Sequence, residues 1–277
     1  MTRSDWLSLL VLAPVAWTFV VQPHGRVARA EAGRTTAVAV GATVTAPAAL
    51  SAPAEPPSGA LPDESRPDTR RMAAGGVAVP LDDAGWRGPD AWRRLRDGSA
   101  GTYIDDVLAG HGAALARWPD RSRRPLTIWV QPEPALWDFD PAYGERVREA
   151  FRAWEATGIP VRFDFTSDSA RAEVHVTWTD RFDEPISGKT IWSRDDEWWI
   201  VDASIVLAVR HSSGDPLDAS AVYAIALHEV GHLIGLDHTR DPATIMTSRV
   251  RVRGLTDADR ATARLVYSLP PGRVRVR

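Results

Sequence analysis

The segment 228–238 reads HEVGHLIGLDH and constrains this chain more than any other stretch. Two of its histidines, His228 and His232, are four residues apart, so on a helix both side chains project from one face. Together they can bind a single metal ion. Glu229 follows the first histidine and can reach a metal-bound water without entering the coordination sphere. The pattern therefore predicts a helix that carries a hydrolytic metal site.

Gly235 and His238 extend this pattern beyond the end of the helix. Gly235 supplies the positive φ with which a helix ends and the chain turns sharply. The turn lets His238 return as a third ligand, and three histidines leave the fourth position of a tetrahedral zinc ion for water. The alternative is a helix with solvated histidines, which the glycine and the third histidine, both in register, disfavour.

Met246 lies eight residues after His238, in the segment 238–246 that reads HTRDPATIM. Here the sequence resembles the metzincin zinc endopeptidases, whose methionine turn forms a hydrophobic floor beneath the metal. Within that clan it resembles the matrixin branch, in the spacing from last ligand to methionine and in the placing of Asp241 and Pro242. A lone methionine is usually core filler, but this spacing favours the methionine turn.

The resemblance implies an α+β fold, a zincin-like catalytic domain with a mixed twisted sheet, an antiparallel edge strand, an active-site helix and a C-terminal helix. It implies a zinc-dependent metalloendopeptidase in which zinc activates a bound water and Glu229 accepts its proton. By resemblance, the segment 189–193 is the edge strand of the cleft, where an extended peptide would add as a further strand. Thr190, Ile191 and Trp192 are therefore the candidate substrate-binding residues.

The hydrophobic patterns predict five strands and three further helices around the metal-binding segment. Asp140 and Pro141 open an amphipathic helix that ends at Gly158, and the active-site helix is expected to begin near Asp218. Thr256 and Asp259 have capping-box spacing at the start of the last helix. The predicted strands are 126–130, 161–165, 173–178, 189–193 and 198–207, and the remaining predicted helix is 104–117, interrupted by two glycines.

We expect one zinc ion rather than two. Matrixins hold a second, structural zinc near a His-Gly-Asp sequence, but the corresponding segment 183–188 here reads DEPISG. His175 fits a hydrogen-bonded strand histidine better than a ligand. Calcium is conceivable but unsupported, because the acidic spacing matches no EF-hand and favours solvated turns. The acidic residues concerned are Asp183, Glu184, Asp195, Asp196 and Glu197.

The chain has no cysteine, which excludes disulfides, thiolate zinc sites and the cysteine switch that silences many matrixin zymogens. The formal net charge of −3 gives no reason to expect nucleic acid or an anionic membrane surface as a partner. We therefore expect a protein or peptide substrate, no stable partner and a monomer.

The N-terminal 30 residues have the features of a signal peptide. Arg3 precedes an apolar run over 6–21, and the Ala-Arg-Ala sequence at 28–30 fits a cleavage site. The run has about 16 residues, fewer than the roughly 20 of a membrane-spanning helix. We expect a secreted, periplasmic or extracellular protein after signal cleavage; the alternative is a membrane anchor formed by residues 6–21.

The rest of the chain divides by composition. We expect a disordered Ala- and Pro-rich linker over 31–76, a prosegment or N-terminal strap over 77–121, the matrixin-like peptidase domain over 122–270 and a basic tail over 271–277. In the 77–121 segment, His111 with Asp105 or Asp106 would ligate zinc in a latent form, but a solvated helix is the favoured interpretation.

Two alternatives to an active exported endopeptidase stay open. One is a latent processing peptidase held at the membrane, and the other is a zinc-bearing binding module without catalysis. Glu229 argues against the binding module, because a structural zinc site needs no general base and usually has four protein ligands. The alternation in 250–253 fits either a surface strand or the pocket beside the metal.

Overall fold

The computed structural model describes residues 36–44 and 89–274, all within one compact unit that spans 33–277. The predicted signal peptide and the anchor over 6–21 lie outside these residues, as do 45–88 of the linker and prosegment and the last three residues of the tail. Among the described helices, none combines the length and the apolar character that crossing a membrane requires.

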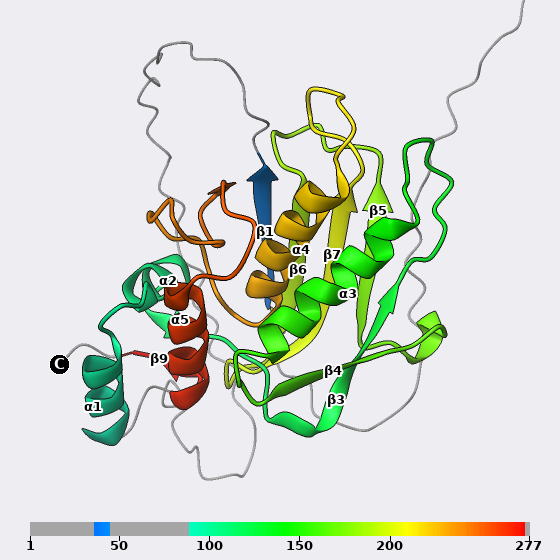
Figure 1. Ribbon diagram of the computed structural model, residues 1–277. Helices are drawn as coiled ribbons and strands as arrows, with labels where there is room; N and C mark the ends of the chain where they lie inside the picture. Colours follow the sequence, from blue (N-terminus) through cyan, green and yellow to red (C-terminus); the bar gives the residue numbers. More distant parts are fainter. Residues whose placement is uncertain (1–35, 45–88, 275–277) are drawn as a thin grey trace, which may run out of the picture. The chain divides into compact units, whose positions relative to one another are not determined.

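A mixed seven-stranded sheet with helices on it forms the fold, which confirms the predicted α+β class (Figure 1). The strand order is β4-β3-β5-β7-β6-β1-β8, and a separate pair joins β2 to β9. The strands are β1 (Thr36–Val44), β2 (Ala114–Leu115), β3 (Arg121–Val130), β4 (Val161–Phe165), β5 (Val174–Thr179), β6 (Gly188–Arg194), β7 (Ile200–Ala208), β8 (Arg249–Val250) and β9 (Gly272–Arg273). The helices are α1 (Pro89–Gly98), α2 (Ile104–Gly110), α3 (Ala142–Glu155), α4 (Ala219–Leu233) and α5 (Asp257–Ser268), with a 3₁₀ turn at Ser169–Arg171.

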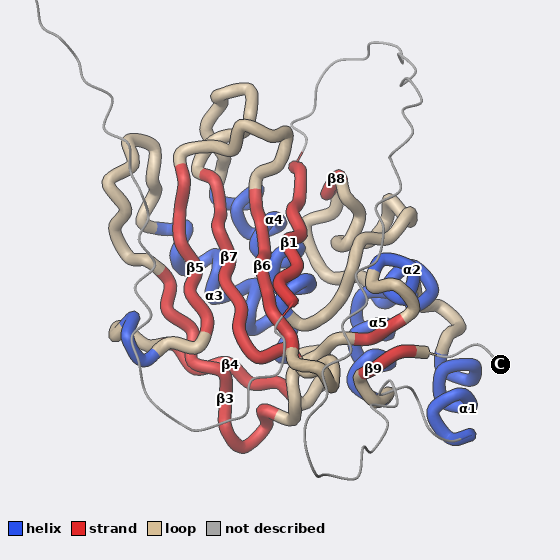
Figure 2. The backbone as a smooth tube through the Cα atoms, turned by 180° about the vertical axis from the view of Figure 1, so that it is seen from behind, coloured by secondary structure: helices blue, strands red, loops and turns tan. Residues whose placement is uncertain are grey.

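Strand direction changes between β7 and β6 and again between β6 and β1. Strands β4, β3, β5 and β7 run parallel, and β6 pairs antiparallel with β7 through the tight connection at 195–199. The two predicted strands 189–193 and 198–207 thus pair as a hairpin, and the first is the predicted antiparallel strand. Strands β1 and β8 continue the sheet beyond β6, so β6 has a neighbour on each side (Figure 2).

Helices α3 and α4 lie on the same face of the sheet (Figure 1). The apolar stripe of α3, which includes Val147, Phe151 and Trp154, is buried as its helical spacing predicts. The indole Nε1 of Trp154 donates to the carbonyl of Leu227 at 2.8 Å, and that of Trp118 donates to the carbonyl of Leu233 at 2.9 Å. Two buried tryptophans, one from the segment before β3 and one from α3, thus hold the last two turns of α4.

Three segments differ from the sequence expectation. The helix predicted over 104–117 ends at Gly110, because the chain turns through positive φ at Gly112 and Ala113 before entering β2. Helix α1 was not predicted. Nine residues inside the expected disordered linker form β1, which aligns Thr36–Ala42 with Arg194–Gly188 of β6.

The segment before β3 contributes to the hydrophobic core. Ala91, Tyr103, Ile104, Val107 and Trp118 are buried in the same cluster as the strands and α4. The C-terminal β9 pairs with β2 of this segment. Residues 89–118 are therefore packed as part of the folded domain.

Candidate active site

Helix α4 positions two of the three histidines and the glutamate. Asp218 caps its N-terminus, accepting from the Ala221 N–H at 2.7 Å, as the sequence predicts. Nearly all of α4 is buried, including His228, Glu229 and His232 at 0 % exposure. A helix so enclosed cannot rotate to give its polar side chains to water, so these groups must find their partners inside the protein.

The turn after α4 is closed by Gly235, whose φ is +93°. A Cβ at this glycine would also lie 2.1 Å from the carbonyl oxygen of Ala116, so both conformation and space require glycine. The chain then returns, and His238 Nε2 lies 3.2 Å from His228 Nε2. His232 Nε2 lies 2.9 Å from the same atom, and the ligand atoms of the three side chains all fall within 4.8 Å of one another.

The tautomers of the two helix histidines follow from their carbonyl partners. His228 Nδ1 lies 2.7 Å from the Ile245 carbonyl oxygen, and His232 Nδ1 lies 3.0 Å from that of Leu236. A carbonyl oxygen only accepts, so both Nδ1 atoms carry the proton and both neutral rings present an Nε2 lone pair. Lone pairs that face each other at 2.9 Å cannot satisfy one another. A bound cation would satisfy them, and the carbonyls would orient the rings as metal sites typically require.

Burial keeps both rings neutral. It lowers the pKa of His228 to about 3, with the neighbouring His238 adding to the effect. Burial also holds the pKa of His232 well below its ordinary value, helped by the other two histidines. Neutral imidazole is the form that binds a metal ion, so these rings are ready for a ligand role at neutral pH.

Glu229 is held by the neighbouring strand. The hydroxyl of Thr190 on β6 lies 2.6 Å from Glu229 Oε2 and 3.0 Å from the backbone oxygen of the same residue. A Cβ at Gly188 would come within 2.6 Å of Glu229 Oε1. Strand β6 therefore packs directly on the helix turn that bears the carboxylate, and Thr190 fixes its orientation.

Met246 lies beneath the histidine-bearing helix and is fully buried. A Cβ on Gly231 would meet Met246 Sδ at 2.3 Å, its Cε at 3.0 Å and Trp154 at 3.2 Å. The Met246 carbonyl accepts from the Thr239 N–H at 3.0 Å, which ties this turn to the loop carrying His238. The methionine thus forms a floor under the α4 turn between His228 and His232.

Comparison with known proteins agrees with this arrangement. Residues 181–268 match the family model described as Matrixin. Over 177 residues the chain is 25 % identical to Metalloendoproteinase 1 of Glycine max, a match that covers 57 % of this chain and 54 % of that protein. Both matches agree with the resemblance to matrixin-like metzincins that the histidine and methionine spacing indicates. The chain spans about half the length of this curated relative.

The relative is named a metalloendoproteinase, and zinc is the metal that matrixins use. The three histidines of the matrixin-like domain provide a candidate site for it. They are the one group of three or more ligating side chains that the described residues bring within reach of one ion. The acidic residues considered for calcium do not gather in this way; Asp195 instead accepts from the N–H groups of Glu197 and Trp199 in the β6–β7 turn.

The three residues predicted to bind substrate all lie on β6 but differ in environment. Thr190 is buried against Glu229, Trp192 is buried in the core, and Ile191 is exposed. The outer side of this strand pairs with β1. His175, which lies on β5, has its Nε2 2.9 Å from the Ser169 carbonyl oxygen, in line with the hydrogen-bonded interpretation.

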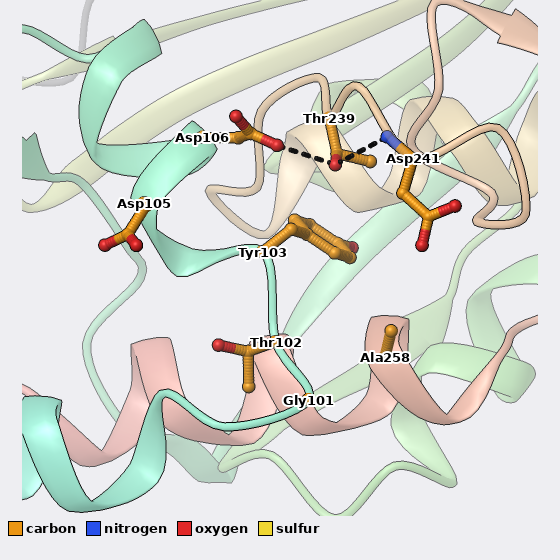
Figure 3. Close-up of a pocket in the computed structure, with 8 residues that line it drawn as sticks. All are labelled: Gly101, Thr102, Tyr103, Asp105, Asp106, Thr239, Asp241 and Ala258. Atoms are coloured by element: carbon orange, nitrogen blue, oxygen red, sulfur yellow. Dashed lines mark hydrogen bonds between the residues drawn. The ribbon is translucent and has the colours of Figure 1, made fainter.

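Helix α2 holds the loop of the third histidine through contacts that no sequence signal indicated. Asp106 accepts from the Thr239 hydroxyl at 2.8 Å and from the Arg240 N–H at 3.3 Å, and Thr239 in turn accepts from the Asp241 N–H (Figure 3). These side chains line a hollow of about 460 Å³. The interpretation of Asp106 as a solvated helix residue is therefore wrong.

His111 is likewise neither solvated nor part of the metal group. Its side chain is 5 % exposed, and its Nε2 lies 3.5 Å from Asp237 Oδ2. Its ring meets that of Trp192 edge-on, with centroids 5.6 Å apart. Burial lowers the pKa of His111, although the nearby Asp237 opposes this shift. The absence of a side chain at Gly110 lets the strap approach the loop of the third histidine, because a Cβ at Gly110 would collide with Asp237 Oδ2.

A second contact runs from the strap to His228 through the C-terminal helix. The Tyr103 hydroxyl donates to Asp259 Oδ1 at 2.9 Å, and the Ile245 N–H donates to Asp259 Oδ2 at 3.1 Å. The Ile245 carbonyl is the group that orients His228. Asp259 also closes the predicted capping box with Thr256. The sequence signalled the capping box but gave no sign of Tyr103.

Proposed function

We propose that this protein is a zinc-dependent endopeptidase that hydrolyses peptide bonds with Glu229 as general base. The observation that carries the proposal is the convergence of three histidine Nε2 atoms, two of them from α4, near the buried carboxylate that the same helix bears. A zinc ion held by His228, His232 and His238 would lower the pKa of a bound water and polarise the scissile carbonyl.

The chain's own residues supply the proton transfers. Glu229 accepts a proton from the attacking water and gives it to the departing amine nitrogen. Thr190 donates to the Oε2 atom of Glu229 and so fixes the orientation of the carboxylate beside β6. The buried setting excludes bulk water, which strengthens each of these electrostatic contacts.

The stoichiometry and the organisation of the chain extend this proposal. We propose one zinc per chain, no calcium requirement, a monomer and a protein or peptide substrate. We also propose that residues 89–121 are a strap that stays with the domain over 122–270 rather than a removable prosegment, because their buried residues share its core. Export by a cleaved signal peptide over 1–30, with membrane anchoring through 6–21 as the alternative, belongs to the same proposal.

The two alternative functions make different predictions. A zinc-bearing binding module would bind peptides without cutting them, whereas a latent processing peptidase would cut few sequences or require activation. The short contact between Thr190 and Glu229 favours catalysis, because a site without turnover has no need to orient this carboxylate.

The test is cleavage of a mixed peptide library by the zinc-loaded full chain. Two variants are assayed in parallel. Glu229→Gln keeps the shape of the side chain, and Glu149→Gln is a matched change at a residue on the surface of α3 that pairs with Arg146. We expect one zinc per chain in all three proteins and cleavage by the parent and Glu149→Gln alone. Equal cleavage by Glu229→Gln, or no cleavage by any zinc-loaded protein, would refute the proposal.

A further inference from the structure

Strand β1 occupies the outer side of β6, where a peptide would add to the sheet. It runs antiparallel to β6, with Ala42 opposite Gly188, Val40 opposite Thr190 and Thr36 opposite Arg194. At its end it runs parallel to β8, which follows the methionine turn (Figure 2). The segment therefore lies between two strands that belong to the candidate site.

The register places the backbone of β1 beside the catalytic carboxylate. Its partner residues Gly188 and Thr190 are the two that pack on Glu229. Paired strands lie about 5 Å apart, and β1 and α4 approach to within 8 Å between Cα atoms. An extended segment with main-chain partners on β6, placed next to a general base, has the position of a peptide to be cut.

The sequence of the segment suits this position. Residues 36–44 read TAVAVGATV, a stretch of small and β-branched residues without a charge. Strand addition relies on main-chain hydrogen bonds, and such residues favour the extended conformation it needs. Since the chain has no cysteine, it has no thiolate with which to silence a zinc ion. A segment lying in the cleft blocks it without one.

We infer that the segment Thr36–Val44 is the first substrate of the site: it fills the cleft as a strand and is cut there by the same molecule. The inference rests on the proposed function. Water adds across one peptide bond within 38–42, so that the carbonyl carbon gains the hydroxyl and the nitrogen gains the proton. Each product has fewer main-chain bonds to β6 than the intact strand, and its departure opens the cleft to small, uncharged aliphatic peptides.

Self-cleavage is measured first, by intact-protein mass spectrometry of the zinc-loaded full chain over time. We expect loss of an N-terminal piece whose end falls within 38–42, with the same first-order half-time at tenfold dilution, and no loss in Glu229→Gln. A rate that falls in proportion to the dilution would overturn the inference, because cutting would then occur between molecules.

Occupancy is measured without any cleavage, in zinc-loaded Glu229→Gln. A fluorescent peptide with the sequence of residues 34–46 is titrated, and binding is followed by anisotropy. The test variant adds Ala39→Pro with Val40→Pro; adjacent N–H groups of a strand point to opposite sides, so two prolines remove at least one bond to β6. The matched control adds Ala48→Pro with Ala49→Pro, beyond the end of β1. We expect at least tenfold tighter peptide binding by the test variant than by the parent or the control.

The outcomes separate this inference from the proposed function. If the parent cuts added peptides but leaves residues 36–44 intact, and the prolines do not change peptide binding, the inference is overturned and the endopeptidase stands. If no protein cuts anything, self-cleavage falls together with the proposed function. Tighter peptide binding by the test variant together with Glu229-dependent cutting inside 36–44 would uphold both.

Discussion

Gly231 on α4 provides a test of the floor beneath the histidines. Its missing side chain leaves room for Met246, because a Cβ would lie 2.3 Å from Sδ and 3.0 Å from Cε. Replacing a helical glycine with alanine normally stabilises by about 1 kcal/mol, whereas overpacking a filled core costs about 1–3 kcal/mol. Met246 and the adjacent Trp154 are fully buried, so neither can move into solvent. We expect the cost of overpacking to exceed the gain in helix propensity, so that Gly231→Ala destabilises the chain by about 1–2 kcal/mol.

A matched glycine gives the opposite sign. Gly144 lies on α3, and the nearest atom to its added Cβ is the guanidinium of Arg148 at 3.3 Å, the end of a flexible side chain. Gly144→Ala should therefore stabilise by up to about 1 kcal/mol.

Both changes are measured by urea unfolding and by Tm in the presence of a chelator, so that metal affinity does not enter. A shift of about 2–4 °C is expected for each kcal/mol in a domain of this size. Adding Met246→Ala to Gly231→Ala should cost less than the sum of the two single changes. If Gly231→Ala raises Tm as much as Gly144→Ala does, the methionine does not fill the space beneath this turn and the reasoning fails.

Four further predictions follow from the contacts of the site. Thr190→Val should lower kcat about tenfold with little change in KM, while Thr190→Ser retains most activity; equal loss in both would show that the hydroxyl does not orient Glu229. Tyr103→Phe leaves a buried carboxylate oxygen without its donor and should cost about 1–3 kcal/mol in urea unfolding, against little change for Tyr223→Phe on the partly exposed side of α4. Because the pKa of His228 is about 3 in the folded chain and ordinarily 6.5, the unfolded chain binds a proton that the folded chain refuses. The metal-free protein should therefore lose stability as pH falls from about 6.5 toward 3, and a flat urea midpoint over this range would contradict the burial of that ring. Removing zinc should lower Tm, and zinc at about 1,000 times its Kd should restore about 4 kcal/mol; a Tm insensitive to both treatments would argue against binding by the native state.

The features that the sequence predicted correctly are those with local causes. Asp218 caps α4 through a neighbour three residues away, and Gly235 ends the helix through its own backbone conformation. Histidines at a spacing of four fall on one face of any helix. Signals of this kind can be found without knowing what packs against the element, and they include the spacing that brings the three histidines together.

The features that it missed depend on distant parts of the chain. Tyr103 reaches Asp259 across 156 positions, and Asp106 reaches Thr239 across 133. Nothing near either residue indicates such a partner. Strand β1 is rich in alanine like its surroundings, and its partners β6 and β8 are distant in the sequence. Glycine is likewise needed at Gly110, where α2 ends, because the distant Asp237 leaves no room for a side chain there.

The indole groups of Trp118 and Trp154 donate hydrogen bonds to carbonyls in the histidine-bearing turns of α4. These partners are separated in sequence by 115 positions for Trp118 and by 73 positions for Trp154. The turn cannot open to solvent unless both tryptophans leave their buried places, which exposes much of the core. Amide hydrogen exchange in residues 228–232 should therefore proceed only through global unfolding, at the slowest rates in the molecule. Metal would then leave from an intact fold, and the emptied histidines would keep their arrangement for the next ion.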